Sequence, residues 1–192
     1  MQALPDVYTH VRIVISMVVG LGIARLLTGM ARFVQHPDRI KVYPIHLAWA
    51  FSTLLFLIDF WWWELHLAAL QQWNFGIYVF VIFYAVLFFL ISTLLFPDHM
   101  EEYSGFKDYF MSRRKWFFGL LGFSFLVDLV DTRLKGDAYL QALGTEYPFR
   151  VACFVVLSVV AMFWRNRWFN AIFVVGTLLY QASWKLRQYL NP

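Results

Sequence analysis

Long runs of hydrophobic residues alternate with short polar connectors along the whole chain. Most of these runs reach the length of about 20 residues that an α-helix needs to cross the hydrocarbon core of a bilayer. We therefore expect an all-α polytopic membrane protein, a six-transmembrane-helix bundle in which residues 1–192 form a single integral membrane domain. The predicted spans are residues 11–33, 43–65, 75–96, 113–133, 148–164 and 168–188.

Two connectors carry signals for short helices of their own. In residues 97–115, Asp98 and Glu101 have the spacing of a capping box, which predicts a helix lying along the membrane interface. Between the fourth and fifth spans, Asp137 suits a helix N-cap and Gly144 suits the position after a helix end. A helix of one or two turns is expected there, at the opposite surface.

The starts of several spans resemble one another. YPIHLAW (43–49) matches YPFRVAC (147–153), and WNFGIYVF (73–80) matches WFNAIFVV (168–175). One interpretation is a pair of three-helix repeats, the second inverted, as many transporters have. The interpretation that we prefer is that proline and tyrosine are generic at the starts of membrane helices.

The composition agrees with a membrane protein and excludes several alternatives. Hydrophobic residues make up 61% of the chain and charged residues only 15%, against about a quarter charged in soluble domains. The lipid bilayer is thus the expected surrounding, a homo-oligomer or another membrane subunit stays open as a partner, and the net charge of +4 does not indicate nucleic-acid binding. One cysteine, Cys153, excludes an intramolecular disulfide and a multi-cysteine metal site.

Lysine and arginine are distributed unequally between the two sides of the predicted bundle. Nine lie on the side of the connectors after spans one, three and five, and six on the other side. Because cytoplasmic loops are enriched in positive residues, both termini are expected outside the cytoplasm, in a bacterial-type inner membrane. The N-terminal segment lacks a basic region before its apolar run, so we expect it to be retained and not cleaved as a signal peptide.

Small residues form a ridge on the first span. Ser16, Gly20, Ala24 and Thr28 recur at every fourth position, a spacing that lets two membrane helices approach closely. The ridge predicts the packing face of this helix. Arg25 lies beside it, and we prefer a snorkelling or ion-paired role for Arg25 to a substrate-facing one.

Two carboxylates interrupt apolar runs at one expected depth. Asp59 precedes three tryptophans in the second span, and Asp128 lies in the fourth span, which runs in the same direction. A charged side chain is costly in hydrocarbon, so both are expected to face a polar interior while the tryptophans anchor the membrane boundary. The same outer side also holds further ionisable residues, namely His10, Arg12, His66 and Asp131.

Three roles are open for this cluster. Neighbouring carboxylates suit a proton carrier. A divalent metal bound by Asp59, His66, Asp128, Asp131 or His10 is a second hypothesis, without a recognised metal motif. We prefer a structural ion pair in which Arg12 neutralises Asp128 or Asp131.

The leading functional hypothesis is a small transporter or channel-like bundle with a polar pathway past Asp59, Asp128 and Arg25. The alternative is a non-catalytic membrane scaffold or accessory subunit of a membrane complex. A membrane enzyme or metal-binding membrane protein comes third, because the sequence shows no nucleophile motif, phosphate-binding loop or dense histidine pattern. No catalytic or cofactor-binding residue is assigned.

Overall fold

The computed structural model describes residues 4–36, 42–70 and 72–190, and these form helices and connecting turns without a strand. The predicted all-α class is confirmed. Two elements are short: η1 (Glu64–Ala69), a 3-10 helix, and α5 (Asp137–Ala142). The long helices are α1 (Leu4–Gln35), α2 (Pro44–Trp63), α3 (Phe75–Thr93), α4 (Phe106–Leu134), α6 (Glu146–Phe163) and α7 (Arg167–Leu190).

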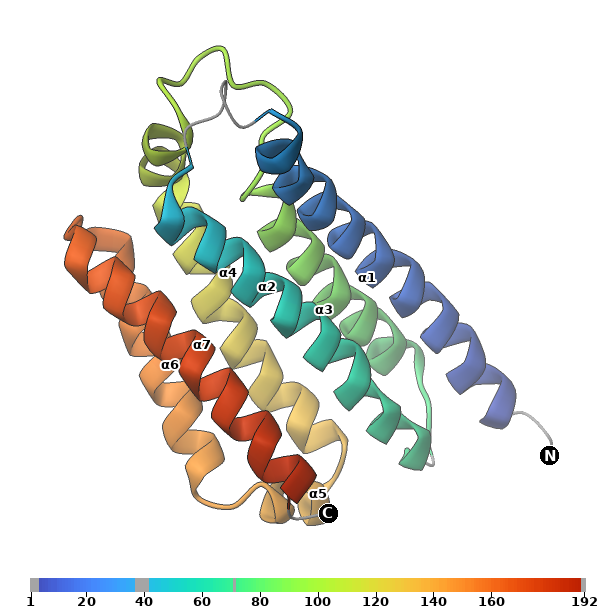
Figure 1. Cartoon of the computed structure of the whole chain (residues 1–192). Coiled ribbons are helices and arrows are strands. Elements are labelled where there is room, and N and C mark those ends of the chain that lie inside the picture. The colour runs from blue at the N-terminus through green and yellow to red at the C-terminus, as the bar shows by residue number, and fades with distance from the viewer. Residues whose placement is uncertain (1–3, 37–41, 71, 191–192) are drawn as a thin grey trace.

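The long helices run alternately in opposite directions (Figure 1). We call the end of the molecule where α1 begins and α7 ends the termini end, and the other the loop end. At the termini end α2 passes into η1, and α5 connects α4 to α6. Helix α1 packs mainly on α3, α4 packs mainly on α6, and α2 lies between the two pairs and contacts α7.

Four helices are long and apolar enough to span a membrane: Val7–Gln35, Pro44–Ala69, Phe75–Thr93 and Glu146–Phe163. The chain therefore has the features of a membrane protein. Helices α4 and α7 are long but more polar, because α4 carries charged residues near both ends and α7 carries them in its last turns. Six spans stay a prediction.

The predicted short helices have different outcomes. No separate interfacial helix forms in residues 97–115; α4 begins at Phe106 rather than at residue 113, and the residues before it are turns. Nothing in 106–112 breaks a helix, so those residues extend helix α4 toward its N-terminus. Helix α5 is confirmed, with Gly144 at φ +66° just after its end, although Gly136 and not Asp137 is its N-cap.

The predicted packing ridge of α1 is wrong. A Cβ added at Gly20 would meet no heavy atom within 4 Å, and Ala24 and Thr28 are also exposed. Contact with α2 and α3 is made instead by an apolar stripe that includes Gly22, near Leu57 and Ser92, and Gly29, against the ring of Phe96. Both lines of small residues have helical spacing, and the bulky apolar neighbours of the second decide which one is buried.

The packing does not follow the inverted repeat. In that correspondence α1, α2 and α3 match α4, α6 and α7, so the close α1–α3 contact would be matched by α4 on α7. Helix α4 packs on α6 instead. The sequence similarity is therefore best explained by the general preference for proline and tyrosine at the starts of membrane helices.

An aromatic cluster fills the bundle toward the loop end. Trp49 is fully buried, with its ring centroid 5.4, 5.3 and 5.0 Å from those of Phe117, Phe118 and Phe173. Edge-to-face contacts of this kind stabilise the packing of α2, α4 and α7. Nearer the loop end, buried His46 donates from Nε2 to the Leu95 carbonyl at 2.6 Å. The bundle is thus closely packed toward the loop end, whereas a cavity lies toward the termini end.

Candidate functional site

A cavity of about 100 Å³ lies between the helices toward the termini end. Side chains from α2, α3, α4, α6 and α7 line it, and residues of η1 and α5 close it at that end. Three of the predicted site residues, Asp59, Asp128 and Asp131, line this one cavity. The polar and charged lining consists of Asp59, Glu64, Tyr84, Ser124, Asp128, Asp131, Thr132, Lys135, Tyr139, Tyr147, Arg150, Tyr180 and Gln181.

Two ion pairs lie at the more exposed part of the cavity. Asp59 Oδ1 is 3.1 Å from Lys185 Nζ, and their side chains are 27% and 30% exposed. Asp128 Oδ2 is 3.3 Å from an Arg150 terminal nitrogen, with side chains 24% and 20% exposed. Both carboxylates are thus accessible from the surface of the helix bundle.

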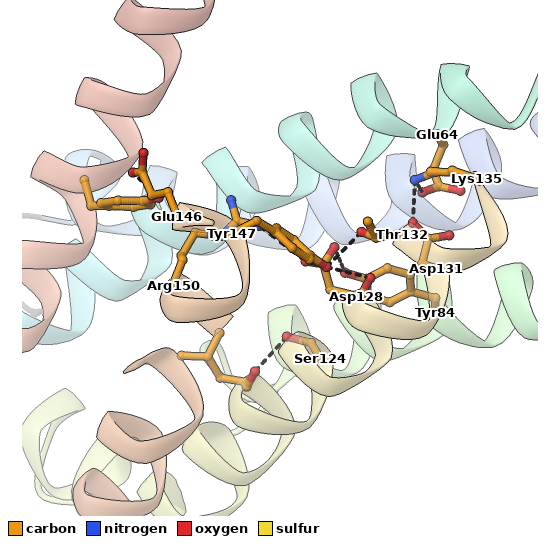
Figure 2. Close-up of polar contacts among 12 residues, drawn as sticks. Glu64, Tyr84, Ser124, Asp128, Asp131, Thr132, Lys135, Glu146, Tyr147 and Arg150 are labelled. Carbon is orange, nitrogen blue, oxygen red and sulfur yellow. Dashed lines mark hydrogen bonds and ion pairs between the residues drawn. The ribbon is translucent and has the colours of Figure 1, made fainter. Parts of the chain in front are cut away.

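Asp128 is the centre of a hydrogen-bond network (Figure 2). The Tyr84 hydroxyl donates to Oδ1 at 3.3 Å, and the Tyr147 hydroxyl lies 3.0 Å from Oδ2 and 2.8 Å from the Thr132 hydroxyl. The Arg150 guanidinium lies over the Tyr147 ring, 5.1 Å from its centroid. These contacts from α3, α4 and α6 fix the carboxylate in one orientation.

A buried triad, Glu64, Asp131 and Lys135, forms the deep part of the site. Lys135 Nζ donates to Glu64 Oε1 at 2.8 Å and to Asp131 Oδ2, and Figure 2 shows it directed toward both carboxylates. The side chains are only 6%, 2% and 2% exposed, respectively. Burial lowers the pKa of Lys135, but the charges of Asp131 and Glu64 outweigh it and hold that pKa above its ordinary value. Lys135 is therefore a cation.

The triad leaves two carboxylate oxygens without partners. Glu64 Oε2 and Asp131 Oδ1 are buried and accept no hydrogen bond from the described residues. A buried acceptor without a donor loses its interaction with water and gains nothing in return. Among the cavity carboxylates in the described part of the chain, Glu64 and Asp131 are the two with such an oxygen.

Arg25 does not join the cavity. It donates to Asp98 Oδ1 at 2.5 Å and to the Phe96 carbonyl at 2.7 Å, near the loop end. The hydrogen bond and charge of Arg25 hold the pKa of Asp98 below its ordinary value. The structure thus gives Arg25 an ion-paired position away from Asp59 and Asp128.

The expected role of Arg12 is wrong. Asp128 is paired with Arg150 and Asp131 with Lys135, while the Arg12 guanidinium lies 5.7 Å from the Trp61 ring centroid. Arg12 lies on α1. Arg150 on α6 and Lys135 at the end of α4 line the same cavity as the two aspartates.

The histidines are not gathered with the carboxylates. The His66 ring stacks on Trp63 at a centroid distance of 5.5 Å and lies tilted against Tyr139 at 4.7 Å, and His10 is exposed on α1. Within residues 4–36, 42–70 and 72–190, no three histidine, cysteine, aspartate or glutamate side chains are placed to hold a metal ion. The divalent-metal hypothesis gains no support from the geometry.

Several site residues are not evident from the sequence. Lys135 follows Asp131 by four positions on one helix, a spacing that signals an ion pair and could have identified it. Glu64 stands just after the tryptophans, where it is less conspicuous than Asp59. The others come from distant parts of the chain and carry no local signal: Tyr84, Tyr147, Arg150 and Lys185.

No protein-family model, curated protein or solved structure matches this chain.

Proposed function

We propose that the protein is a small membrane transporter or channel-like bundle whose polar pathway enters the cavity past Asp59 and Asp128. The observation that carries this proposal is that both carboxylates, on helices running in the same direction, line one partly exposed cavity. Ionisable side chains within membrane helices that face a shared, water-accessible space are the usual mark of an ion or substrate pathway.

The charges of the cavity favour a cationic or protonic cargo. Four carboxylates line it, Asp59, Glu64, Asp128 and Asp131, and two cationic side chains, Lys135 and Arg150. Lys185 binds Asp59 from the side of α7. An entering cation can bind Asp59 or Asp128 in competition with Lys185 or Arg150, because these two pairs are partly exposed. Arg25 is not part of this pathway, since it binds Asp98 near the loop end.

One observation favours the alternative, a membrane scaffold or accessory subunit. Each carboxylate that lines the cavity has a cationic partner within ion-pair distance. Paired charges of this kind fix the register of packed helices without any transport. The two functions differ in what the loss of one charge does.

The test is Asp59→Asn in the purified protein reconstituted into liposomes. The amide keeps the shape of the side chain and removes its charge, so we expect loss of proton or monovalent-cation flux, followed with an internal pH-sensitive or cation-sensitive dye. The melting temperature should stay near wild type, because a partly exposed pair contributes only about 1 kcal/mol or less.

Glu146→Gln is the matched control. Glu146 forms a comparable pair with Arg187, at 2.7 Å between Nη2 and Oε1, but does not line the cavity, so its flux should equal that of wild type. Wild-type liposomes that conduct no better than empty ones would refute the transport proposal. A strongly destabilised Asp59→Asn protein, with no stabilisation of either protein by cations, would favour the scaffold.

A further inference from the structure

The Glu64–Asp131–Lys135 triad has one carboxylate more than it has cations. Glu64 lies where α2 passes into η1, and Asp131 and Lys135 lie one turn apart at the end of α4. Both carboxylates bind the same ammonium, and all three side chains are more than nine-tenths buried. With both acids ionised, the triad would carry a net charge of −1 at a position that is more than nine-tenths buried.

The groups around the triad do not supply the missing positive charge. Arg150 on α6 is bound to Asp128, which adds a further negative charge nearby. The Tyr84 hydroxyl on α3 donates to Asp128, the Tyr147 hydroxyl on α6 bonds to Asp128 and Thr132, and Tyr139 on α5 presents its ring to Lys135. An uncompensated buried carboxylate takes up a proton in preference to staying charged.

Arg12 on α1 is the remaining cation near Glu64. It lines, with Glu64, a second small cavity of about 10 Å³ on the side of α1. In the described part of the chain Arg12 forms no ion pair with Glu64, and its guanidinium lies over the ring of Trp61. It therefore leaves the buried Glu64 Oε2 without a partner.

Glu64 lies between the two cavities. Among the described residues, it is the one side chain that lines both. The smaller cavity has room for about one water molecule, and the larger one, of about 100 Å³, has room for several. A proton on Glu64 thus has water within reach on either side.

We propose that the triad binds one exchangeable proton, held on the Glu64 carboxyl, while Asp131 and Lys135 remain an ion pair. Release transfers the proton from the carboxyl oxygen to a water molecule and leaves a carboxylate, which then shares the Lys135 ammonium with Asp131. Uptake reverses this step. That this proton is the transported or coupling ion rests on the proposed function. That the triad binds a proton does not depend on transport.

The test is infrared spectroscopy of the purified protein in detergent at pH 7. A buried protonated carboxyl gives a carboxylic-acid C=O stretching band that shifts when H₂O is replaced by D₂O. Glu64→Gln should remove this band because it removes the acid. Asp131→Asn should also remove it, because Lys135 then has only Glu64 as its partner and holds it ionised.

Asp59→Asn is the control, since Asp59 has its own cation, Lys185, and its loss should leave the band unchanged. The inference is overturned by the absence of the band in wild type, by its survival in either triad variant, or by its loss in Asp59→Asn. Where a triad variant does not fold, ¹³C-labelled glutamate in the wild type replaces it: the band must then shift, and an unshifted band overturns the assignment to Glu64.

The infrared spectrum tests the bound proton and the flux measurement tests transport, so either proposal can be refuted without the other. A band with the expected pattern but no flux leaves the bound proton in place and refutes transport. Flux without the band keeps the pathway and refutes the triad as its proton site.

Discussion

Burial separates the ion pairs of this protein into two energetic classes. Lys135 is 2% exposed and binds two carboxylates, whereas Lys185 is 30% exposed and binds one. In water-accessible positions the attraction between charges is largely offset by the loss of hydration, so such a pair contributes little. A buried cation is different, because its removal leaves charges that no solvent compensates.

Lys135→Met should therefore destabilise the protein by about 3–5 kcal/mol. The methionine fills a similar volume but leaves Asp131 and Glu64 facing each other without a cation. Lys185→Met, the matched change at the partly exposed pair, should cost about 1 kcal/mol or less. Denaturant unfolding of both variants in the same detergent measures the difference, and equal losses would show that the buried triad contributes no more than the exposed pair.

Three of the four cavity carboxylates, Asp59, Asp128 and Asp131, were predictable from the sequence, whereas Glu64 and most of the cationic partners were not. Asp59 and Asp128 are conspicuous because they interrupt apolar runs, and a common direction of their helices placed them at one depth. Lysines and arginines near helix ends, in contrast, are explained equally well by snorkelling and by membrane orientation. Nothing local distinguishes Arg150 or Lys185, which reach the site from α6 and α7 only after the helices pack.

At the scale of the helix, α1 shows why a small-residue pattern alone does not identify a packing face. The line through Gly20 and the line through Gly22 and Gly29 have equally suitable spacings. The second also carries the bulky residues of the buried stripe, Val11, Ile15, Val19, Leu26 and Phe33. A prediction that weighed apolar volume together with small size would have selected it.

Gly29→Ala should lower stability, because an added Cβ would lie 2.1 Å from Cγ of Phe96, a side chain only 1% exposed. Overpacking of this kind costs about 1–3 kcal/mol. At Gly20 no atom lies within 4 Å, so Gly20→Ala should be neutral or gain up to about 1 kcal/mol from helix propensity. Thermal unfolding of the two variants in detergent decides; a Gly20→Ala protein less stable than Gly29→Ala would mean that α1 is rotated.

The start of helix α4 also shows that a sequence pattern alone does not locate a structural feature. The predicted start at residue 113 follows the end of the polar segment, because hydropathy marks where a membrane begins and not where a helix begins. The helix extends back to Phe106, where Gly105 at φ +149° ends the preceding turns. Phe106, Tyr109 and Phe110 are buried, so packing against the bundle continues the helix through a polar stretch.

At the scale of the whole molecule, the two ends differ in how their positive charges are used. At the termini end Lys135, Arg150, Lys185 and Arg187 all bind carboxylates. At the loop end, in the part of the chain that the structure describes, Arg25 is the cation with a carboxylate partner, while others are exposed without one, including Lys107, Arg113, Lys115, Arg165 and Arg167. Two more of the nine lysines and arginines counted on this side, Arg39 and Lys41, lie outside the described residues.

The orientation is expected from the nine-to-six count of lysines and arginines on the two sides. The loop end keeps its exposed lysines and arginines beside the bilayer, where they favour the cytoplasmic side. We therefore predict that the loop end faces the cytoplasm.

Cysteine labelling tests this orientation with two matched positions. Ser104, before α4, and Ala138, on α5, are both exposed and lie at opposite ends of the molecule. In a Cys153→Ala background, a membrane-impermeant maleimide should label the Ala138→Cys variant in intact cells. It should label the Ser104→Cys variant only after the membrane is permeabilised, because that residue lies with the exposed lysines and arginines. The reverse pattern would place the termini end, and with it the cavity, on the cytoplasmic side.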